Sequence, residues 1–360
     1  MKFIDYVVLF YIVWMALNGL SANNYSYKMQ AYYKAMIGGF SYALFYYWGR
    51  YSHFKLTDIF KNMLYPLLLC MLTGLYFFIS PPAWYLAMKY NQLNDTGDTM
   101  HYEEIFRLSS FWGHPYHICY SITLFSIYLQ YKLLSGKTKN KAIDIALLTL
   151  CAVVLFCGQL RVCIIFFLAS FLLMMLLNKG KYFKSKLLYI YIAVFAVLFL
   201  FAISSLSNKI NFEYVNTHMS LLTDEESMEG RLEGTAGLIK TYSLEGEGFG
   251  KYQLIARQYK KYAIIDNQYA NTLAELGYLG LSLLVLIILL SLYRMFTHQK
   301  YYIEICVVLF YFVNWFGASS LINSSQYAFI FWFCLGRLWS DSNYTYFEPK
   351  EDRFIVSNVR

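Results

Sequence analysis

Polar side chains interrupt the stretch IIDNQYANTLAELGYLGL, at residues 264–281, where a long apolar run begins. Asp266 and Asn267 stand at its start, and Asn271 and Glu275 follow Asn267 at intervals of four residues, which places these three on one face of a helix. A carboxylate with an ordinary pKa of about 3.9 is ionised at neutral pH and can accept a proton as a general base. Asp and Asn are also favoured as helix N-caps. The pattern therefore leaves a chemical and a structural role open.

A glycine-rich stretch lies upstream, within LLTDEESMEGRLEGTAGLIKTYSLEGEGFGKY at 221–252. Thr223 followed by Glu226 fits a capping box, and the spacing of the apolar residues after it predicts a short amphipathic helix. The glycines that alternate from Gly246 to Gly250 are expected to end that helix. They resemble a phosphate-binding loop only superficially, because Tyr252 stands where Ser or Thr is needed and no strand precedes them.

Long apolar segments must position these polar residues. Hydrophobic residues make up 58% of the 360 residues and charged residues only 14%, which is too apolar for a soluble globular domain. Unbroken apolar runs long enough to cross a hydrocarbon core of about 30 Å recur along the chain, whereas β-barrels lack such runs. We therefore expect an all-α, polytopic integral membrane protein of about ten spans, with up to about twelve compatible with the sequence. The first run lacks a small-residue cleavage site and is expected to remain as a span. The expected spans are 3–20, 31–48, 63–80, 111–133, 143–158, 160–178, 187–206, 271–293, 302–318 and 321–339.

Positive charges fall on one side of these spans. The formal net charge is +8, and the short loops that carry Lys or Arg share one side if the N-terminus is cytoplasmic. This positive-inside pattern accounts for most of the excess charge, so no nucleic-acid partner is expected. The same topology places a loop at 81–110 outside and both termini inside. The chain then divides into N-terminal spans within 1–206, an extracytoplasmic loop at 207–268, C-terminal spans within 269–340 and a cytoplasmic tail at 341–360.

Few ionisable residues lie inside the expected spans, which bears on the class of protein. A transporter usually places such groups near the middle of the bilayer, on broken helices. Here Asp5, Asp144 and Glu304 lie near span ends, and polar residues gather at the expected outer face. A reaction at the outer membrane surface is therefore favoured over a path through the membrane. The seven cysteines fall within expected spans without paired spacing and are expected to be apolar core residues.

Several segments, in their order along the chain, resemble the signature of the O-antigen polymerase and O-antigen ligase superfamily. The matching segments are Gly230-Arg231, LEGEGFG at 244–250, DNQY at 266–269 and LAELGYLGL at 273–281, with GQLRV at 158–162 and FWGHPYHICYSITL at 111–124 as earlier matches. Together they cover roughly the C-terminal two thirds of the chain. Asp266 stands where ligases of the superfamily usually carry His, which favours the polymerase branch.

The resemblance implies a membrane glycosyltransferase of the bacterial cytoplasmic membrane. Such an enzyme transfers a glycan from an undecaprenyl-diphosphate-linked oligosaccharide donor to a hydroxyl of a lipid-linked acceptor glycan, with inversion, at the outer face of the bilayer. It uses no nucleotide sugar, no cofactor and no obligatory metal. A chain-length regulator and a flippase are the protein partners that such a polymerase implies.

The diphosphate leaving group of such a donor needs positive charge while the anomeric bond breaks, and Arg is best suited because its fork binds phosphate oxygens bidentately. Arg161 and Arg231 are the catalytic candidates, and Arg257, Lys260 and Lys261 are candidates for substrate binding. Each has a structural alternative: Arg161 can snorkel at its span end, Arg231 can form an exposed ion pair, and the other three can contact lipid headgroups.

The remaining candidates concern the acceptor. Asp266 is the candidate general base, with the N-cap as its alternative role, while Asn267 is expected to cap or orient and Glu275 to satisfy polar groups inside the bundle. Asn267 and Glu275 are also candidates for substrate binding. His114 and His117, spaced i, i+3, are expected to line the acceptor cavity or to hydrogen-bond within the bundle, because no Cys or carboxylate on the same helix face completes a metal site.

Three functions remain open from the sequence. A polysaccharide polymerase that joins lipid-linked repeat units is the first. A ligase that moves a finished glycan to another acceptor is the second, and Asp266 in place of His disfavours it. A flippase or other transporter of lipid-linked sugars is the third, and it would need charged residues along a central cavity.

Overall fold

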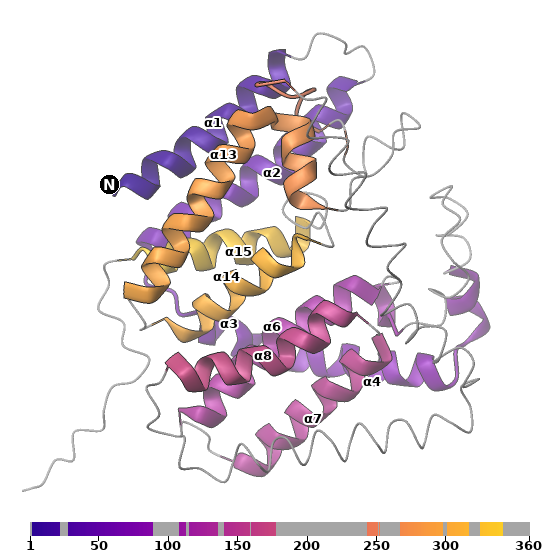
Figure 1. Cartoon of the computed structure of the whole chain (residues 1–360). Helices are drawn as coiled ribbons and strands as arrows, with labels where there is room; N and C mark the ends of the chain where they lie inside the picture. Colours follow the sequence, from indigo (N-terminus) through magenta and orange to yellow (C-terminus); the bar gives the residue numbers. More distant parts are fainter. Residues whose placement is uncertain are drawn as a thin grey trace, which may run out of the picture.

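A computed structural model of the chain shows a bundle of helices (Figure 1). All regular secondary structure in the described residues is helical. The structure describes residues 2–21, 28–88, 108–112, 115–135, 140–158, 160–177, 243–250, 252, 267–297, 301–316 and 325–340.

The helices form at nearly the positions that the apolar runs predict. Every expected span within the described residues coincides with a helix. A helix hydrogen-bonds all backbone polar groups of an apolar run within the run itself, which lipid cannot do. The expected span at 187–206, most of the loop at 207–268 and the tail at 341–360 lie outside the described residues. The short helix α3 is an addition that hydropathy does not predict. Among the described residues, the helices whose two ends are defined are α1 (Phe3–Ser21), α2 (Lys28–Tyr51), α3 (Leu56–Asn62), α4 (Leu64–Ile79), the 3-10 turn η2 (Ser110–Trp112), α6 (Pro115–Leu134), α7 (Lys141–Gly158), α8 (Arg161–Leu177), α13 (Gln268–Thr297), α14 (Tyr302–Asn314) and α15 (Ser325–Leu338).

The length and apolar character of these helices indicate a membrane protein. Among the described residues, α7 and α13 are long and apolar enough to cross a bilayer, and α3 with α4 forms a third span if the pair, bent by 50°, is counted as one. The remaining apolar helices are shorter, with apolar parts at Phe3–Gly19, Val162–Met175, Tyr302–Asn314 and Tyr327–Leu338. Short helices of this kind reach across a bilayer only with help from flanking residues or local thinning.

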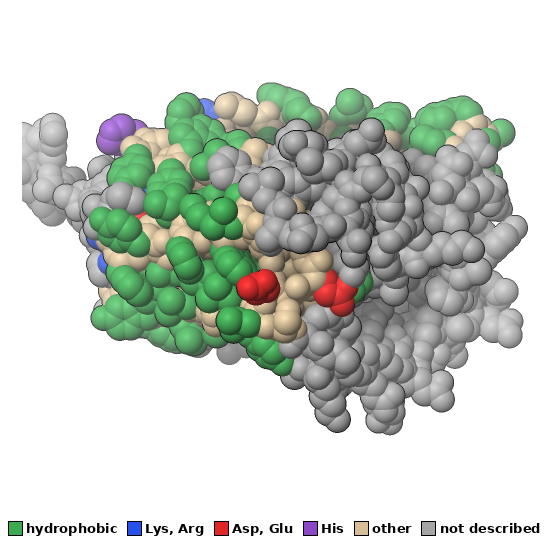
Figure 2. Space-filling model, turned by 90° about the horizontal axis from the view of Figure 1, so that it is seen from above, with side chains coloured by type: hydrophobic (Ala, Val, Ile, Leu, Met, Phe, Trp, Pro, Cys, Tyr) green, Lys and Arg blue, Asp and Glu red, His purple; other side chains and the backbone are tan. Residues whose placement is uncertain are grey.

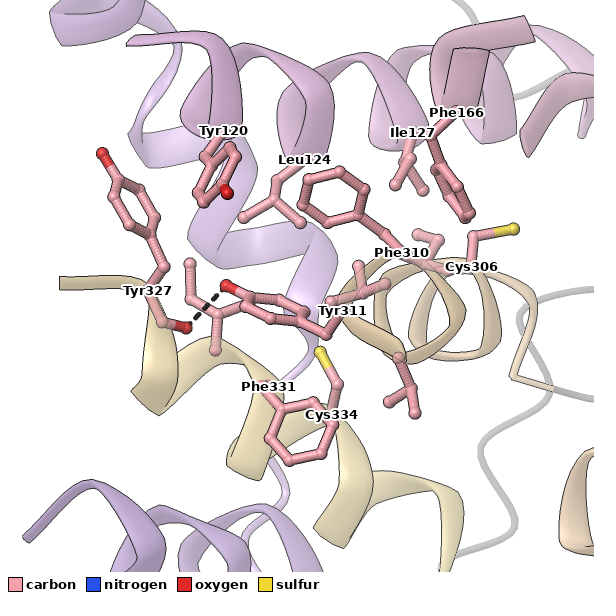
Figure 3. Close-up of a cluster of buried hydrophobic side chains, with 14 of the residues drawn as sticks. Tyr120, Leu124, Ile127, Phe166, Cys306, Phe310, Tyr311, Tyr327, Phe331 and Cys334 are labelled. Carbon is pink, nitrogen blue, oxygen red and sulfur yellow. Dashed lines mark hydrogen bonds between the residues drawn. The ribbon is translucent and has the colours of Figure 1, made fainter. Parts of the chain in front are cut away.

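The helices pack in two groups that α14 joins. Helices α1, α2, α13 and α15 contact one another, and α4, α6, α7 and α8 form the second group. Helix α14 packs against α15 on one side and against α6 and α8 on the other (Figure 1). Figure 3 shows side chains of α6, α8, α14 and α15 interlocked in the shared core, among them Tyr120, Leu124, Ile127, Phe166, Phe310, Tyr311, Phe331 and Cys334.

Helices α2 and α15 approach each other closely through two glycines. A Cβ added at Gly49 would clash with the backbone carbonyl of Phe333, and one at Gly336 would clash with the carbonyl of Tyr46. Small residues where two helices meet let their backbones approach closely. Membrane helices associate through such van der Waals packing, because lipid tails are as apolar as the side chains and the hydrophobic effect does not drive association.

Gly336→Leu is expected to destabilise the fold by about 3 kcal/mol or more, because the new side chain must displace backbone and not a flexible side chain. Thermal unfolding of the detergent-solubilised chain would measure the loss. Val313→Leu introduces the same side chain at a half-exposed position of α14 and should leave the melting temperature nearly unchanged. Equal stability of the two variants would contradict the close crossing.

Basic residues gather at one end of the first helix group. Asp5 of α1 is fully buried and pairs with Arg50 of α2, whose Nε lies 3.4 Å from Asp5 Oδ1. Arg294 Nε donates to the carbonyl of Leu338 at 3.0 Å, and Arg337 Nη1 donates to the carbonyl of Ser52 at 2.9 Å. Residues that the expected topology assigns to the cytoplasmic side therefore lie together, and the opposite end carries the polar residues that are described next.

Candidate functional site

Helix α13 is broken at Gly277, where the sequence predicts a continuous span over 271–293. Gly277 has φ 68° and ψ −169°, a conformation essentially restricted to glycine. The N-terminal part, Gln268–Leu276, begins at the C-terminal end of α14, where the Gln268 amide donates to Trp315 O at 2.9 Å. Figure 1 shows the two parts of α13 meeting at the break, beside the segment drawn at 243–250. The polar part of α13 is thus set apart from its apolar part.

The segment 243–250, called here the docked glycine segment, fills this break. Its amides replace helical donors: Glu247 N donates to Ala274 O at 2.8 Å and Gly248 N to Glu275 O at 3.0 Å. In return, Leu279 N donates to Leu244 O at 3.3 Å. The carbonyls that a broken helix leaves without intrahelical partners are thereby satisfied.

Two glycines make this docking sterically feasible. Gly246 has φ 76° and a Cβ there would lie 2.7 Å from Glu275 O. A Cβ at Gly277 would clash with the carbonyl of Leu244. Both positions therefore combine a left-handed backbone with direct contact between two chain segments, and only glycine meets both conditions.

Helices α1 and α2 hold the docked glycine segment from the other side. The Asn18 side chain donates through Nδ2 to Glu245 O and accepts from Phe249 N at 2.8 Å. Trp14 Nε1 donates to Leu276 O at 3.0 Å. Phe249 is buried against α2, where its Cζ would lie 2.8 Å from a Cβ at Gly39. Sequence reasoning missed Asn18 and Trp14, although a single Asn near the end of an otherwise apolar run is a usable signal.

Glu275, a candidate for substrate binding, lies inside the protein. Its side chain is only 1% exposed, and Oε1 accepts the Tyr252 amide at 2.9 Å. The Tyr252 hydroxyl in turn donates to the Glu247 carboxylate at 2.9 Å. The carboxylate of Glu275 therefore holds the chain that leaves the docked glycine segment, which agrees with the expectation that it satisfies polar groups inside the bundle.

Asn267 caps the N-terminal part of α13, one of the two roles expected for it. Its Oδ1 accepts the amides of Tyr269 at 2.9 Å and Ala270 at 3.1 Å, and its Nδ2 donates to Phe316 O at 3.3 Å. The last bond fastens the start of α13 to Phe316, two residues beyond the C-terminal end of α14. Asp266, the preceding residue, lies outside the described residues.

Asn267→Ala is expected to lower the free energy of unfolding by about 1 kcal/mol, because two amides of the first turn lose their acceptor. Asn267→Asp keeps an acceptor of the same size and should retain most of the stability. Chemical denaturation in detergent measures both variants. An alanine variant as stable as the wild type would argue that the cap carries no energy here.

The polar face expected on α13 is present and points into the protein. Gln268, Asn271, Thr272 and Glu275 are each at most 2% exposed. Gln268 Nε2 donates to Thr272 Oγ1 at 3.2 Å along this face. Within the part of the chain that the structure describes, Asn271 Oδ1 has no hydrogen-bond donor. A polar surface buried this deeply requires partners from the protein or from a bound polar group.

A second polar cluster contains the candidate His117. The Tyr327 hydroxyl of α15 donates to the His117 carbonyl of α6 at 2.6 Å, and the two rings stack with centroids 5.9 Å apart. Ser121 Oγ donates to the same tyrosine hydroxyl at 3.1 Å, and Tyr120 Oη donates to Asn314 Oδ1 at 2.8 Å. Figure 3 shows Tyr120 and Tyr327 near each other, with the Tyr311 hydroxyl bonded to the Tyr327 carbonyl.

The C-terminal end of α14 connects the two polar regions. Asn314 binds α6 through Tyr120, and the next residue, Trp315, accepts the first amide of α13. Through these two residues the structure links the start of α13, with Asn267 and Glu275, to the α6 cluster of His117, which lies far away in the sequence. Figure 2 shows the end of the molecule at the top of Figure 1, where acidic side chains interrupt a mainly hydrophobic described surface. Glu245 and Glu247 are the exposed acidic residues of the docked glycine segment.

The other candidates lie outside the described residues: Arg231, Arg257, Lys260, Lys261, Asp266 and His114. Arg161 is the first residue of α8, and only its backbone is described. Among the described residues, no three His, Cys, Asp or Glu side chains form a group able to hold a metal. All seven cysteines are buried except Cys70, which is half-buried.

Comparisons with protein-family models, with curated proteins and with solved structures find no match to this chain. The resemblance seen in the sequence therefore stands on its own residues. Two of its segments, LEGEGFG and LAELGYLGL, are those that dock on each other at the break in α13.

Proposed function

We propose that the chain is a polysaccharide polymerase of the bacterial cytoplasmic membrane, which joins lipid-linked repeat units at the outer face. In this proposal about ten helices cross the bilayer, and both termini face the cytoplasm. The donor and the acceptor are oligosaccharides on undecaprenyl diphosphate. The product is O-antigen, capsule or exopolysaccharide.

The observation that carries the proposal is the docking of the glycine segment on the broken helix α13. The two segments resemble parts of one family signature, lie more than twenty residues apart in the sequence, and are joined by backbone hydrogen bonds through Glu247, Gly248 and Leu279. A chance resemblance gives no reason for these two segments to pack together. Here a Cβ at Gly246 would clash with the Gly277 amide nitrogen, and a Cβ at Gly277 would clash with the Gly246 amide nitrogen, so the close packing needs glycine at both positions.

The proposed chemistry is the displacement of a diphosphate by a sugar hydroxyl. The acceptor hydroxyl attacks the anomeric carbon of the donor glycan, and Asp266 takes the hydroxyl proton. The bond between that carbon and the diphosphate oxygen breaks, which releases undecaprenyl diphosphate. Arg161, Arg231 and Arg257 bind the developing negative charge, with Lys260 and Lys261 assisting.

Glu275 and Asn267 support the site in this proposal through the contacts already described. Asn267 fixes the start of α13, one residue after Asp266, to the end of α14. The polar cluster at His117, with His114 nearby in sequence, binds the acceptor glycan. A flippase supplies the lipid-linked units and a chain-length regulator sets the length of the product.

The test is the size profile of surface glycan and of carrier-linked glycan in a strain that lacks this chain, with and without the wild-type copy restored. A polymerase predicts single repeat units at the surface or accumulated on the carrier lipid when the chain is absent. Full-length polymer stranded on the carrier would instead identify a ligase. Repeat units held at the cytoplasmic leaflet would identify a flippase, and either of these results would reject the proposal.

A further inference from the structure

The C-terminal half of α1 contacts both partners of the docking described above. Asn18 is 4% exposed and binds the docked glycine segment at Glu245 and Phe249, so one side chain spans the turn that contains Gly246 and Gly248. Trp14, one turn earlier on the same face, binds the Leu276 carbonyl of α13. Helix α1 thus contacts the loop segment and the broken helix at neighbouring positions.

The two bonds of Asn18 use opposite ends of one amide. Nδ2 donates to a carbonyl and Oδ1 accepts from an amide. Asp at this position would keep the acceptor but would place negative charge against the Glu245 carbonyl, and Ala would remove both bonds. A buried Asn that satisfies two backbone groups of another segment fixes the register of that segment, because a shift by one residue would leave the side chain without partners.

We propose that Asn18 is a positioning residue, which sets the docked glycine segment against the polar part of α13 so that glycan transfer can occur. Trp14 acts with it by binding the Leu276 carbonyl, directly before the break. The effect on transfer rests on the function proposed above, whereas the effect on docking does not. A positioning role differs from general stabilisation because its loss affects the segment 243–252 and leaves the rest of the bundle intact.

The experiment compares hydrogen exchange of the full chain in detergent for the wild type, Asn18→Ala, Asn18→Asp and Trp14→Phe. Asn18→Ala is expected to speed exchange of the peptide that covers 243–252 by about 10- to 100-fold, since the Phe249 amide loses its acceptor. Exchange in α6 and α7 should be unchanged. Trp14→Phe keeps the aromatic packing and should give a smaller increase in the same peptide.

Asn140→Ala is the matched control, because Asn140 Oδ1 also accepts two backbone amides, those of Ala142 and Ile143, at the start of α7. It should speed exchange only near 141–144 and leave glycan length unchanged. In cells, Asn18→Ala is expected to reduce polymer yield by about tenfold or more at an unchanged protein level.

The outcomes separate the two proposals. Faster exchange at 243–252 with normal polymer would overturn the role of Asn18 in transfer and leave the proposed function intact. If exchange becomes faster throughout the chain, or does not become faster at 243–252, the positioning role is overturned. If the wild-type chain forms no polymer while Asn18→Ala still loosens 243–252, the proposed function fails and the docking stands.

Discussion

Asp266→Asn is expected to reduce polymer formation by about 100- to 10,000-fold without lowering the amount of folded chain. The amide keeps the size of the side chain and its ability to accept a hydrogen bond, but it cannot take the proton of the acceptor hydroxyl. Because Asn267 supplies the cap of α13, the helix start does not depend on residue 266 as an acceptor. The measurement is the length distribution of surface glycan, together with protein level in membranes.

Two comparisons make this result specific. Asp58→Asn changes the same functional group at an exposed position of α3 and should give a wild-type glycan profile. Arg231→Lys should also reduce polymer strongly, since Lys cannot form the bidentate contact with a diphosphate. Wild-type polymer from Asp266→Asn would remove Asp266 as the base, and wild-type polymer from both variants would argue against the proposed chemistry.

Gly277→Val is expected to abolish stable insertion of the folded chain. The valine side chain must adopt a backbone conformation that is essentially restricted to glycine, at about 1 to 3 kcal/mol, and its Cβ would also clash with the Leu244 carbonyl. Together these effects approach the whole stability of a typical domain, about 5 to 15 kcal/mol. Protein level in membranes and thermal unfolding in detergent measure the loss.

Ser282→Val introduces the same side chain in the apolar part of α13, at an exposed position, and should be tolerated. Gly277→Ala is the milder form, which should fold at reduced stability and show faster exchange at 243–252. If Gly277→Val instead accumulates to the wild-type level with an unchanged melting temperature, α13 is not broken at this residue, and the observation that carries the proposed function is lost.

The helices could be placed from the sequence because each depends on a local property. The segments that form α1, α6, α7 and α8 are rich in apolar residues, and an apolar run inside a bilayer has no better conformation than a helix. Helix α3 was missed because it is short and carries Asp58 and Lys61, which resemble an ordinary charged loop. The cap by Asn267 was among the expected roles, because residue type and position alone indicate it.

The break in α13 could not be predicted from its own residues. The apolar and polar periodicity continues on both sides of Gly277, and a single glycine in a helix costs only about 1 kcal/mol, which packing easily offsets. The helix breaks because the docked glycine segment supplies replacement donors to Ala274 and Glu275. That partner lies more than twenty residues away, so no local pattern contains it.

The sequence by itself determined that this is an α-helical membrane protein, the places where helices form and the residue types able to do chemistry. These follow from hydrophobicity, charge and capping, each of which acts over a few neighbouring residues. Only the tertiary structure decided which polar residues meet, because Asn18, Glu245, Glu275 and Tyr252 are brought together by bonds between backbone and side chains of separate segments. Such bonds form only after the helices have packed, because packing places these segments next to each other.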